Sequence, residues 1–272
     1  MIFLIVKYHL LNGEKIDNLN IKLNYNNPIA MDNNNKIIIE NLDEILLIPI
    51  DKLTLLQCLT FDWKFNKPLC NSLDKLTSLQ HLTFGDWFNQ QLTNSLDKLT
   101  SLQHLTFGWD FNQPLSNSLV KLTSLQHLIF GFCFNQPLYN SLDKLTSLQQ
   151  LTLGYKFNQL LDLPSNIKYL VLDCNNQNII DNLHNNIEEL TLDYNSNLEL
   201  DNLPSSIKKI TIKNKKYNKE LNNLPISVEY IKLSLYYEKK ILYVPKNLKE
   251  IKCHKKYKFI NDFSNCQVSF IE

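Results

Sequence analysis

The feature that most constrains this chain is a tandem repeat with a period of 23 residues. The segment SLDKLTSLQHLTFGDWFNQQLTN, residues 72–94, is followed directly by SLDKLTSLQHLTFGWDFNQPLSN, residues 95–117. Two apolar columns keep this spacing: Leu56, Leu79, Leu102, Leu125 and Leu148, and Phe65, Phe88, Phe111, Phe134 and Phe157. Self-similarity at a fixed period indicates an architecture in which each repeat stacks on its neighbours.

The pattern continues downstream in a shorter form. Five apolar residues start segments at spacings of 20, 20, 21 and 20 residues: Ile167, Ile187, Ile207, Val228 and Leu248. Counted from such a residue as position 1, apolar side chains recur at positions 4 and 6, as in Leu102, Leu105 and Phe107. This alternation is typical of a strand with one face inward. The preceding SLDKLTS segment is too short for a stable helix, so we expect a turn or a short 3₁₀ segment that buries Leu119 and Leu122 on the convex side.

A single coil of this kind cannot bury its own apolar residues. Stacking about ten coils, with each strand paired in parallel to the next, would give them a shared interior. Residues 1–52 depart from the repeat and are predicted to form a divergent N-terminal cap. Within it we expect strands near residues 21–23 and 37–39, joined by a polar loop, and residues 259–272 are expected to cap the other end.

Composition and charge exclude several classes of protein. With 44% hydrophobic residues the chain can bury enough surface to fold, so wholesale disorder is excluded. The net charge is +1, but residues 205–260 contain 15 Lys and 4 Glu, a local balance of +11. Such a block can attract anionic partners or simply form a solvated face. The chain has no Arg, the preferred bidentate reader of phosphate and guanine, so nucleic acid is not the expected partner.

The chain carries little that suggests catalysis. It has no G-x-S-x-G, no phosphate-binding Gly-rich loop and no H-E-x-x-H motif, so we expect no enzyme activity, cofactor or metal. Six cysteines without C-x-x-C spacing indicate reduced thiols in an intracellular protein. The apolar run at residues 2–6 is too short for a signal peptide, and no segment is long enough to span a membrane, so no membrane association is expected.

The L-x-x-L-x-L/F framework, preceded by NSLDKLTSLQ or LPSSIKKITI, resembles leucine-rich repeats. The Phe-Asn-x-Pro-Leu element at residues 65–69, 111–115 and 134–138 resembles the FNIP-repeat subgroup, and the near-identical tandems most resemble FNIP-repeat proteins of mimivirus-type giant viruses. The resemblance covers about residues 53–253 and is most specific over 53–160. Gln91 and Leu160 replace the Pro in two coils. The C-terminal coils lack the Phe-Asn-x-Pro-Leu element and retain only Tyr217-Asn218 as a similar pair.

This resemblance implies a β-rich (α/β-type) right-handed solenoid, leucine-rich-repeat-like, with one strand per 20–23-residue coil. It divides the chain into FNIP-type repeats at 53–161 and shorter leucine-rich-type repeats at 162–258. The implied function is non-enzymatic protein–protein interaction, with a host protein as the partner and the host cytoplasm as the location if the source is viral; a monomer is expected. One alternative is an adaptor for ubiquitin-ligase machinery, since residues 41–50 faintly resemble the start of an F-box. Another is an anionic-ligand binder that uses the Lys-rich C-terminal coils.

Three surface or corner columns are candidate functional residues. An Asn column is expected at a coil corner, with inward amides that bond backbone groups of the next coil: Asn66, Asn89, Asn112, Asn135 and Asn158. An outward His column is copied by the repeat: His81, His104 and His127. One aromatic residue per coil follows the Gly column that starts at Gly85: Trp63, Trp87, Trp109, Phe132 and Tyr155.

Each of these columns has a structural and a functional interpretation. The His ladder does not converge as a tetrahedral zinc site should, and its stacked imidazoles are predicted to titrate near pH 6. The aromatic rings could fold over the Gly positions and shield backbone, or they could form contact hot spots. We take the aromatic strip with the His column beside it as the predicted contact surface for a protein partner.

Overall fold

The computed structural model describes residues 22–24, 27–30, 36–39 and 53–271. The chain is a parallel β-solenoid of about 11 turns with roughly 20 residues per coil, so the predicted fold class is confirmed. It divides into two compact units, one of residues 1–131 and 140–147 and the other of residues 132–139 and 148–272. The F-box-like segment 41–50 and the apolar run 2–6 lie outside the described residues.

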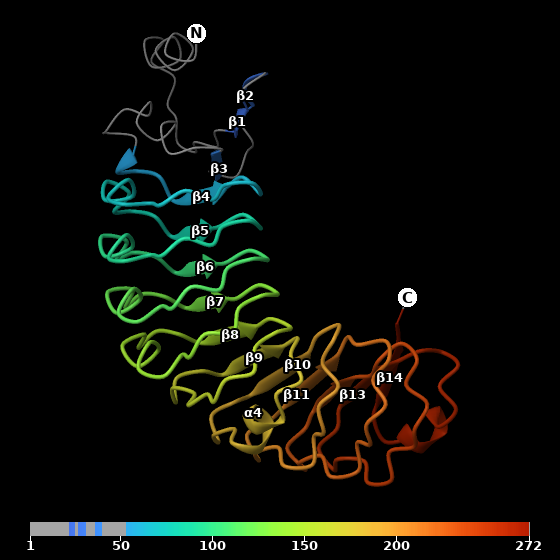
Figure 1. The fold of residues 1–272 in the computed structure, drawn as a ribbon. Coiled ribbons are helices and arrows are strands. Elements are labelled where there is room, and N and C mark those ends of the chain that lie inside the picture. The colour runs from blue at the N-terminus through green and yellow to red at the C-terminus, as the bar shows by residue number, and fades with distance from the viewer. Residues whose placement is uncertain (1–21, 25–26, 31–35, 40–52, 272) are drawn as a thin grey trace. The chain divides into compact units, whose positions relative to one another are not determined.

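In the first unit, each repeat contributes one short strand to a parallel sheet (Figure 1). These strands are β4 (Cys58–Phe61), β5 (His81–Thr83), β6 (His104–Thr106) and β7 (His127–Ile129). Their register follows the repeat, since Leu82 lies opposite Leu105 and Leu105 opposite Leu128. A one-residue slip would turn these leucines outward, so burial of the inner face fixes the pairing.

The interior of this unit is built from the positions that the sequence singles out. Leu102, Leu105 and Phe107 are each at most 1% exposed, and Leu119 and Leu122 of the following turn are fully buried. The SLDKLTS segments form turns, as predicted. Buried leucines from strand and turn therefore meet in one core that continues from coil to coil.

Phenylalanine rings form a second interior column at the end of each strand. Phe84 stacks on Phe107 with ring centroids 5.4 Å apart, and Phe88 stacks on Phe111 at 6.0 Å. Within one coil, Phe107 and Phe111 stack at 4.0 Å. Each ring thus contacts the coil before it as well as its own coil, which couples neighbouring repeats.

Three N-terminal strands extend the sheet of the first unit: β1 (Lys22–Asn24), β2 (Asn27–Ala30) and β3 (Lys36–Ile39). Strand β3 pairs in parallel with β4, and β1 pairs in parallel with β3. The sequence predicted a polar loop where β2 lies, and this was wrong. Strand β2 forms an antiparallel hairpin with β1 at the sheet edge, where Pro28 can be accommodated although it lacks an N–H group.

In the second unit, seven strands pair in parallel in chain order. They are β8 (Gln150–Leu153), β9 (Tyr169–Leu172), β10 (Glu189–Leu192), β11 (Lys209–Ile212), β12 (Tyr230–Lys232), β13 (Glu250–Cys253) and β14 (Gln267–Phe270). Two short helices interrupt the coils, α4 (Gln177–Asp181) and the 3₁₀ helix η1 (Ile260–Phe263). Helix α4 buries Ile179 and Ile180, which replace the leucines of the usual turn.

Buried tyrosines replace phenylalanines in the later coils of the second unit. The hydroxyl groups of Tyr217, Tyr237 and Tyr257 donate to backbone carbonyls 18 or 19 residues earlier, at 2.7–3.1 Å. Burial raises the pKa of each tyrosine hydroxyl, so all three remain neutral donors. A ring that fills the interior therefore also satisfies a carbonyl of the preceding coil.

The Gly column marks the closest approach of one coil to the next. A Cβ atom at Gly108 would lie 2.3 Å from the carbonyl oxygen of Gly85, and one at Gly131 would lie 2.0 Å from that of Gly108. The sequence left two reasons for these glycines, a positive φ or a tight passage. These short distances identify tight passage as the reason, because any side chain would push adjacent coils apart.

We therefore expect Gly108→Ala to lower the free energy of unfolding by about 1–3 kcal/mol, the usual range for overpacking a rigid interior. Urea denaturation followed by circular dichroism measures this change. Thr100→Ala, at an exposed position in the turn of the same coil, is the control and should change stability by less than about 0.5 kcal/mol. Equal stability of the Gly108 variant and the wild type would contradict the tight-passage assignment.

Candidate functional site

The largest exposed aromatic side chains of the first unit form a row on consecutive coils, just after the strands. Trp63, Trp87 and Trp109, which we call the tryptophan row, are 51%, 47% and 53% exposed. The rings of Trp63 and Trp87 contact edge to face, with centroids 5.0 Å apart, and Lys64 Nζ lies 4.6 Å from the Trp63 ring centre. Half of each indole surface is thus open to solvent, although the phenylalanine columns already fill the interior.

The three histidines lie on the outward face of strands β5, β6 and β7. Their rings stack in a continuous ladder, which we call the histidine ladder: His81 to His104 at 4.3 Å and His104 to His127 at 4.3 Å, with nearly parallel ring planes. Cys58 Sγ lies 3.6 Å from His81 Nδ1. The parallel register creates the ladder, because equivalent residues of adjacent strands lie opposite each other.

Partial burial, together with repulsion along the ladder, lowers the pKa of two of these imidazoles, His81 and His104. Burial, followed by repulsion from His81 and His127, lowers the pKa of His104 to about 4. Burial, followed by repulsion from His127, also lowers the pKa of His81. The sequence predicted titration near pH 6. In the structure the pKa of His104 is lower, first because the ring is partly buried and second because a charge on it would lie about 4.3 Å from the next ring. At pH 7 His81 and His104 are therefore neutral rings that can donate and accept hydrogen bonds.

The Asn column connects coils through its side-chain oxygens. Asn66 Oδ1 accepts from the backbone N–H of Asn89 at 3.0 Å, and Asn89 Oδ1 accepts from the N–H of Asn112 at 2.9 Å. In the second unit Asn135 Oδ1 accepts from the N–H of Asn158 at 2.8 Å. The sequence placed these amides inward, but the side chains are half-buried or exposed because the ladder runs along the surface of the corner.

The remaining two aromatic residues of the predicted strip lie in the second unit. Phe132 and Tyr155 stack with ring centroids 4.8 Å apart, and Tyr155 is 43% exposed. Phe132 is half-buried, with Lys156 Nζ 5.8 Å from its ring centre. They form a smaller aromatic pair on this unit.

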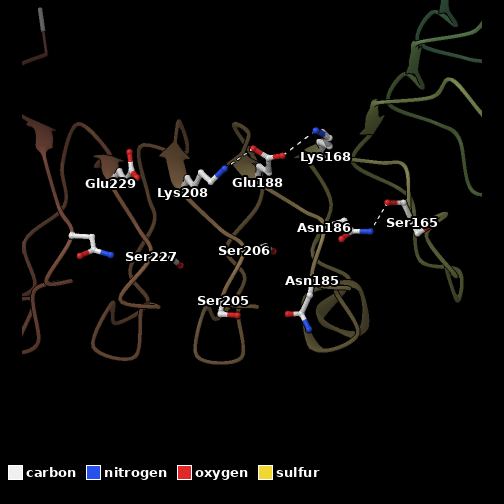
Figure 2. Close-up of a pocket in the computed structure, with 11 residues that line it drawn as sticks. Ser165, Lys168, Asn185, Asn186, Glu188, Ser205, Ser206, Lys208, Ser227 and Glu229 are labelled. Carbon is white, nitrogen blue, oxygen red and sulfur yellow. Dashed lines mark hydrogen bonds and ion pairs between the residues drawn. The ribbon is translucent and has the colours of Figure 1, made fainter.

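A polar groove of about 430 Å³ lies on the second unit, beside the start of strands β9–β13 (Figure 2). Glu188 bridges Lys168 and Lys208 at 3.2 and 3.0 Å along its rim. Below them, Ser206 Oγ donates to the carbonyl of Ile187, and Asn186 Nδ2 donates to that of Ser165. These side chains join adjacent coils to one another, so we assign the groove a structural role and do not take it as a ligand-binding site.

Charges alternate along this rim, which was not predicted from the sequence. Position 2 of successive coils carries Lys168, Glu188, Lys208, Glu229 and Lys249, and Glu229 pairs with Lys249 at 2.6 Å. The alternation of Lys and Glu at spacings of 20 or 21 residues was a readable signal of cross-coil ion pairs. Exposed pairs of this kind each contribute little to stability.

Among residues 53–271 and the three N-terminal strands, no group of three or more His, Cys, Asp or Glu side chains could hold a metal ion. In the same part of the chain, no helix is long and apolar enough to cross a membrane. The six cysteines, all within residues 53–271, form no disulfides.

Comparisons with known proteins agree with this architecture. Residues 194–236 match the FNIP Repeat family. The match lies in the shorter coils and includes Tyr217-Asn218. It lies outside residues 53–160, where the sequence resemblance is most specific. The solved giant-virus protein CroV588, a circular leucine-rich-repeat protein, is 26% identical over 87% of this chain, with a TM-score of 0.57. This alignment covers 39% of CroV588, so the chain spans about two fifths of its length.

Two further solved structures share the fold at lower sequence identity. The internalin InlF of Listeria monocytogenes is 16% identical, with a TM-score of 0.54 over 82% of this chain and 70% of its own. TLR13, solved in complex with ssRNA13, is 14% identical, with a TM-score of 0.53 over 92% of this chain and 42% of its own. No curated protein sequence matches the chain. The chain is therefore similar to leucine-rich-repeat-like and FNIP-repeat scaffolds, which are generally non-catalytic and commonly bind proteins.

The lowered pKa of His104 makes stability depend on pH. An unfolded His titrates near 6.5 and the folded one near 4, so the unfolded state binds more protons between these values. The contribution of neutral His104 to the free energy of unfolding is complete above about pH 6.5 and is lost as the pH falls toward 4. His104→Gln copies the residue found at the same position of a later coil, Gln150. We expect this variant to reduce the change in the free energy of unfolding between pH 6.5 and pH 4. Urea unfolding of both proteins from pH 7 to 4.5 tests this, and parallel curves would show that the ladder is not the cause.

We expect Asn89→Ala to lower the free energy of unfolding by about 1–2 kcal/mol, since the N–H of Asn112 and the Nε2 of Gln113 would both lose an acceptor. Denaturant titration measures the change. Asn117→Ala, at an exposed position of the neighbouring turn, should be near neutral. If both variants lose the same stability, the loss reflects a general sensitivity to Asn substitution and not the ladder.

Proposed function

We propose that the chain is a non-enzymatic repeat scaffold that binds a protein partner through the outward face of its first unit. The tryptophan row forms one side of this contact face and the histidine ladder the other. The observation that carries the proposal is the exposure of Trp63, Trp87 and Trp109 on consecutive coils whose interior is complete without them. Large, rigid, half-exposed aromatic rings are the residues most enriched in protein-binding hot spots.

The chemistry of the face favours a partner with little net charge. The imidazoles of His81 and His104 are neutral at pH 7. The strand positions between the two columns carry Thr60, Thr83 and Thr106, with Ile129 on the last strand. Such a surface offers apolar area together with adaptable hydrogen-bonding groups, as protein interfaces do. A repeated, open face without an enclosed pocket suits an extended protein surface better than a small substrate.

The FNIP-repeat match and the likeness to a giant-virus protein support a host protein as the partner, in the cytoplasm of the infected cell. An adaptor that presents a bound protein to ubiquitin-ligase subunits is the alternative function. The F-box-like residues 41–50 on which it depends lie outside the described residues, so no structural observation favours it.

We expect Trp109→Ala to weaken binding to the partner by tenfold or more, because it removes a large anchor, while the free energy of unfolding changes by less than about 1 kcal/mol. Proximity labelling in expressing cells identifies proteins that the wild type marks and the variant does not. The affinity of the purified partner is then measured for both proteins by calorimetry.

Leu55→Ala is the matched control, since Leu55 is also an exposed apolar residue of this unit, 66% exposed, but lies away from the row. Its labelling profile should match that of the wild type. A Trp109 variant that loses stability but keeps its partner would contradict the proposal. Recovery of ligase subunits that depends on residues 41–50 would favour the adaptor instead.

A further inference from the structure

The structure separates the lysines of the C-terminal coils into two groups. Seven lysines of residues 205–260 form ion pairs with carboxylates: Lys208, Lys209, Lys213, Lys219, Lys239, Lys240 and Lys249. The other eight have ammonium groups that form no ion pair or hydrogen bond within residues 53–271. Six of these eight lie on strands β12 and β13 or in the turns after β11 and β13, and we call them the basic patch: Lys215, Lys216, Lys232, Lys252, Lys255 and Lys256. The excess positive charge seen in the sequence is therefore concentrated in one set of side chains.

Two lysines of the basic patch are neighbours on the outward face of the sheet. Lys232 of β12 and Lys252 of β13 are direct partners in the parallel register, on strands about 4.8 Å apart. The flanking residues of this row are uncharged, Thr211 on β11 and Ser269 on β14. Like charges placed side by side on a sheet are destabilising, so fold stability does not explain this pair.

The other four lysines lie in the turns that follow β11 and β13. Lys215 and Lys216, and then Lys255 and Lys256, are all exposed. The turn between them, after β12, carries Tyr236, which is 63% exposed. Three consecutive coils thus present a lysine pair, an aromatic ring and a second lysine pair in sequence.

Within the described residues, no carboxylate forms an ion pair with a lysine of the basic patch. Glu250 of β13 accepts a hydrogen bond from Ser269 Oγ at 2.7 Å. Glu238, which directly follows the buried Tyr237, is exposed. The buried rings of Tyr217, Tyr237 and Tyr257 supply the interior of these coils, so Tyr236 is not needed for packing. Both the charges and the ring therefore remain available to a ligand.

We propose that the basic patch binds single-stranded nucleic acid, with phosphates held by the lysines and a base stacked on Tyr236. Lysine-lined surfaces with interspersed aromatic rings hold single strands without reading their sequence. The lack of Arg removes base-specific recognition but not attraction to the backbone, which revises the expectation drawn from the sequence. An acidic peptide or an anionic membrane would use the lysines but would not require a ring between them.

This surface is separate from the contact face of the first unit, so the two proposals can fail independently. The test is fluorescence anisotropy of a fluorescein-labelled 15-nucleotide oligothymidylate with the full chain at 50 mM salt. We expect Lys232→Thr/Lys252→Thr, which copies Thr211, to weaken binding at least tenfold without lowering the thermal midpoint. The slope of log K against log salt should become shallower by about 1.4, for two lost phosphate contacts on a single strand.

The matched control is Lys208→Thr/Lys249→Thr, which removes the same charge from ion-paired lysines and should change affinity less than about threefold. Tyr236→Ala should weaken binding on the order of tenfold through the lost stacking. Three results would overturn the proposal: no binding by the wild type at 50 mM salt, equal weakening by the control pair, or patch-dependent binding to phosphatidylserine vesicles or polyglutamate without binding to the oligonucleotide.

Discussion

The contact of each coil with the next is the interaction on which the rest of the structure depends. At the start of each strand, a backbone N–H donates to the coil before it, as from Gln103 to the carbonyl of Gln80 at 2.8 Å, and from Gln126 to that of Gln103 at 2.8 Å. The leucines and phenylalanines of one coil are buried only because the next coil covers them. The glycines at the strand ends allow this approach without a gap.

Parallel in-register stacking has a consequence for the surface. Equivalent residues of successive coils must lie in rows. Any residue copied by the repeat therefore forms a row in which neighbours are about 4.8 Å apart, the spacing of adjacent strands. The histidine ladder and the tryptophan row arise in this way in the first unit, and the basic patch arises from the same geometry in the second. Interior positions hold the fold together while outward positions can differ, which lets two units of one architecture carry chemically different faces.

Much of the fold could be predicted from the sequence because the period directly encodes which residues share a position. Leu105 and Phe107 are buried as the alternation required, and the SLDKLTS segments are turns because they are too short to be helices. The hairpin strand β2 could not be predicted, since its pairing depends on a partner strand and not on its own polar composition.

The surface was harder to predict than the interior. The repeat indicated that the Asn side chains form hydrogen bonds from coil to coil. How far these side chains are exposed depends on the backbone conformation at the coil corner, which the repeat does not specify. The pKa of His104 depends on ring-to-ring distance, which sequence spacing does not give. Which lysines are paired likewise depends on the register of side chains from different coils, and only the structure distinguishes Lys208 from Lys232.

The central claim is that coils stabilise one another, so that no coil of the first unit is folded independently. Native-state hydrogen exchange of the wild type and of Leu105→Ala tests it most directly. We expect the cavity in β6 to lower the protection of amides in β5 and β7 as well as in β6, since these strands share one interior. A loss of protection confined to the coil that contains residue 105 would show that the coils are independent and would contradict the account.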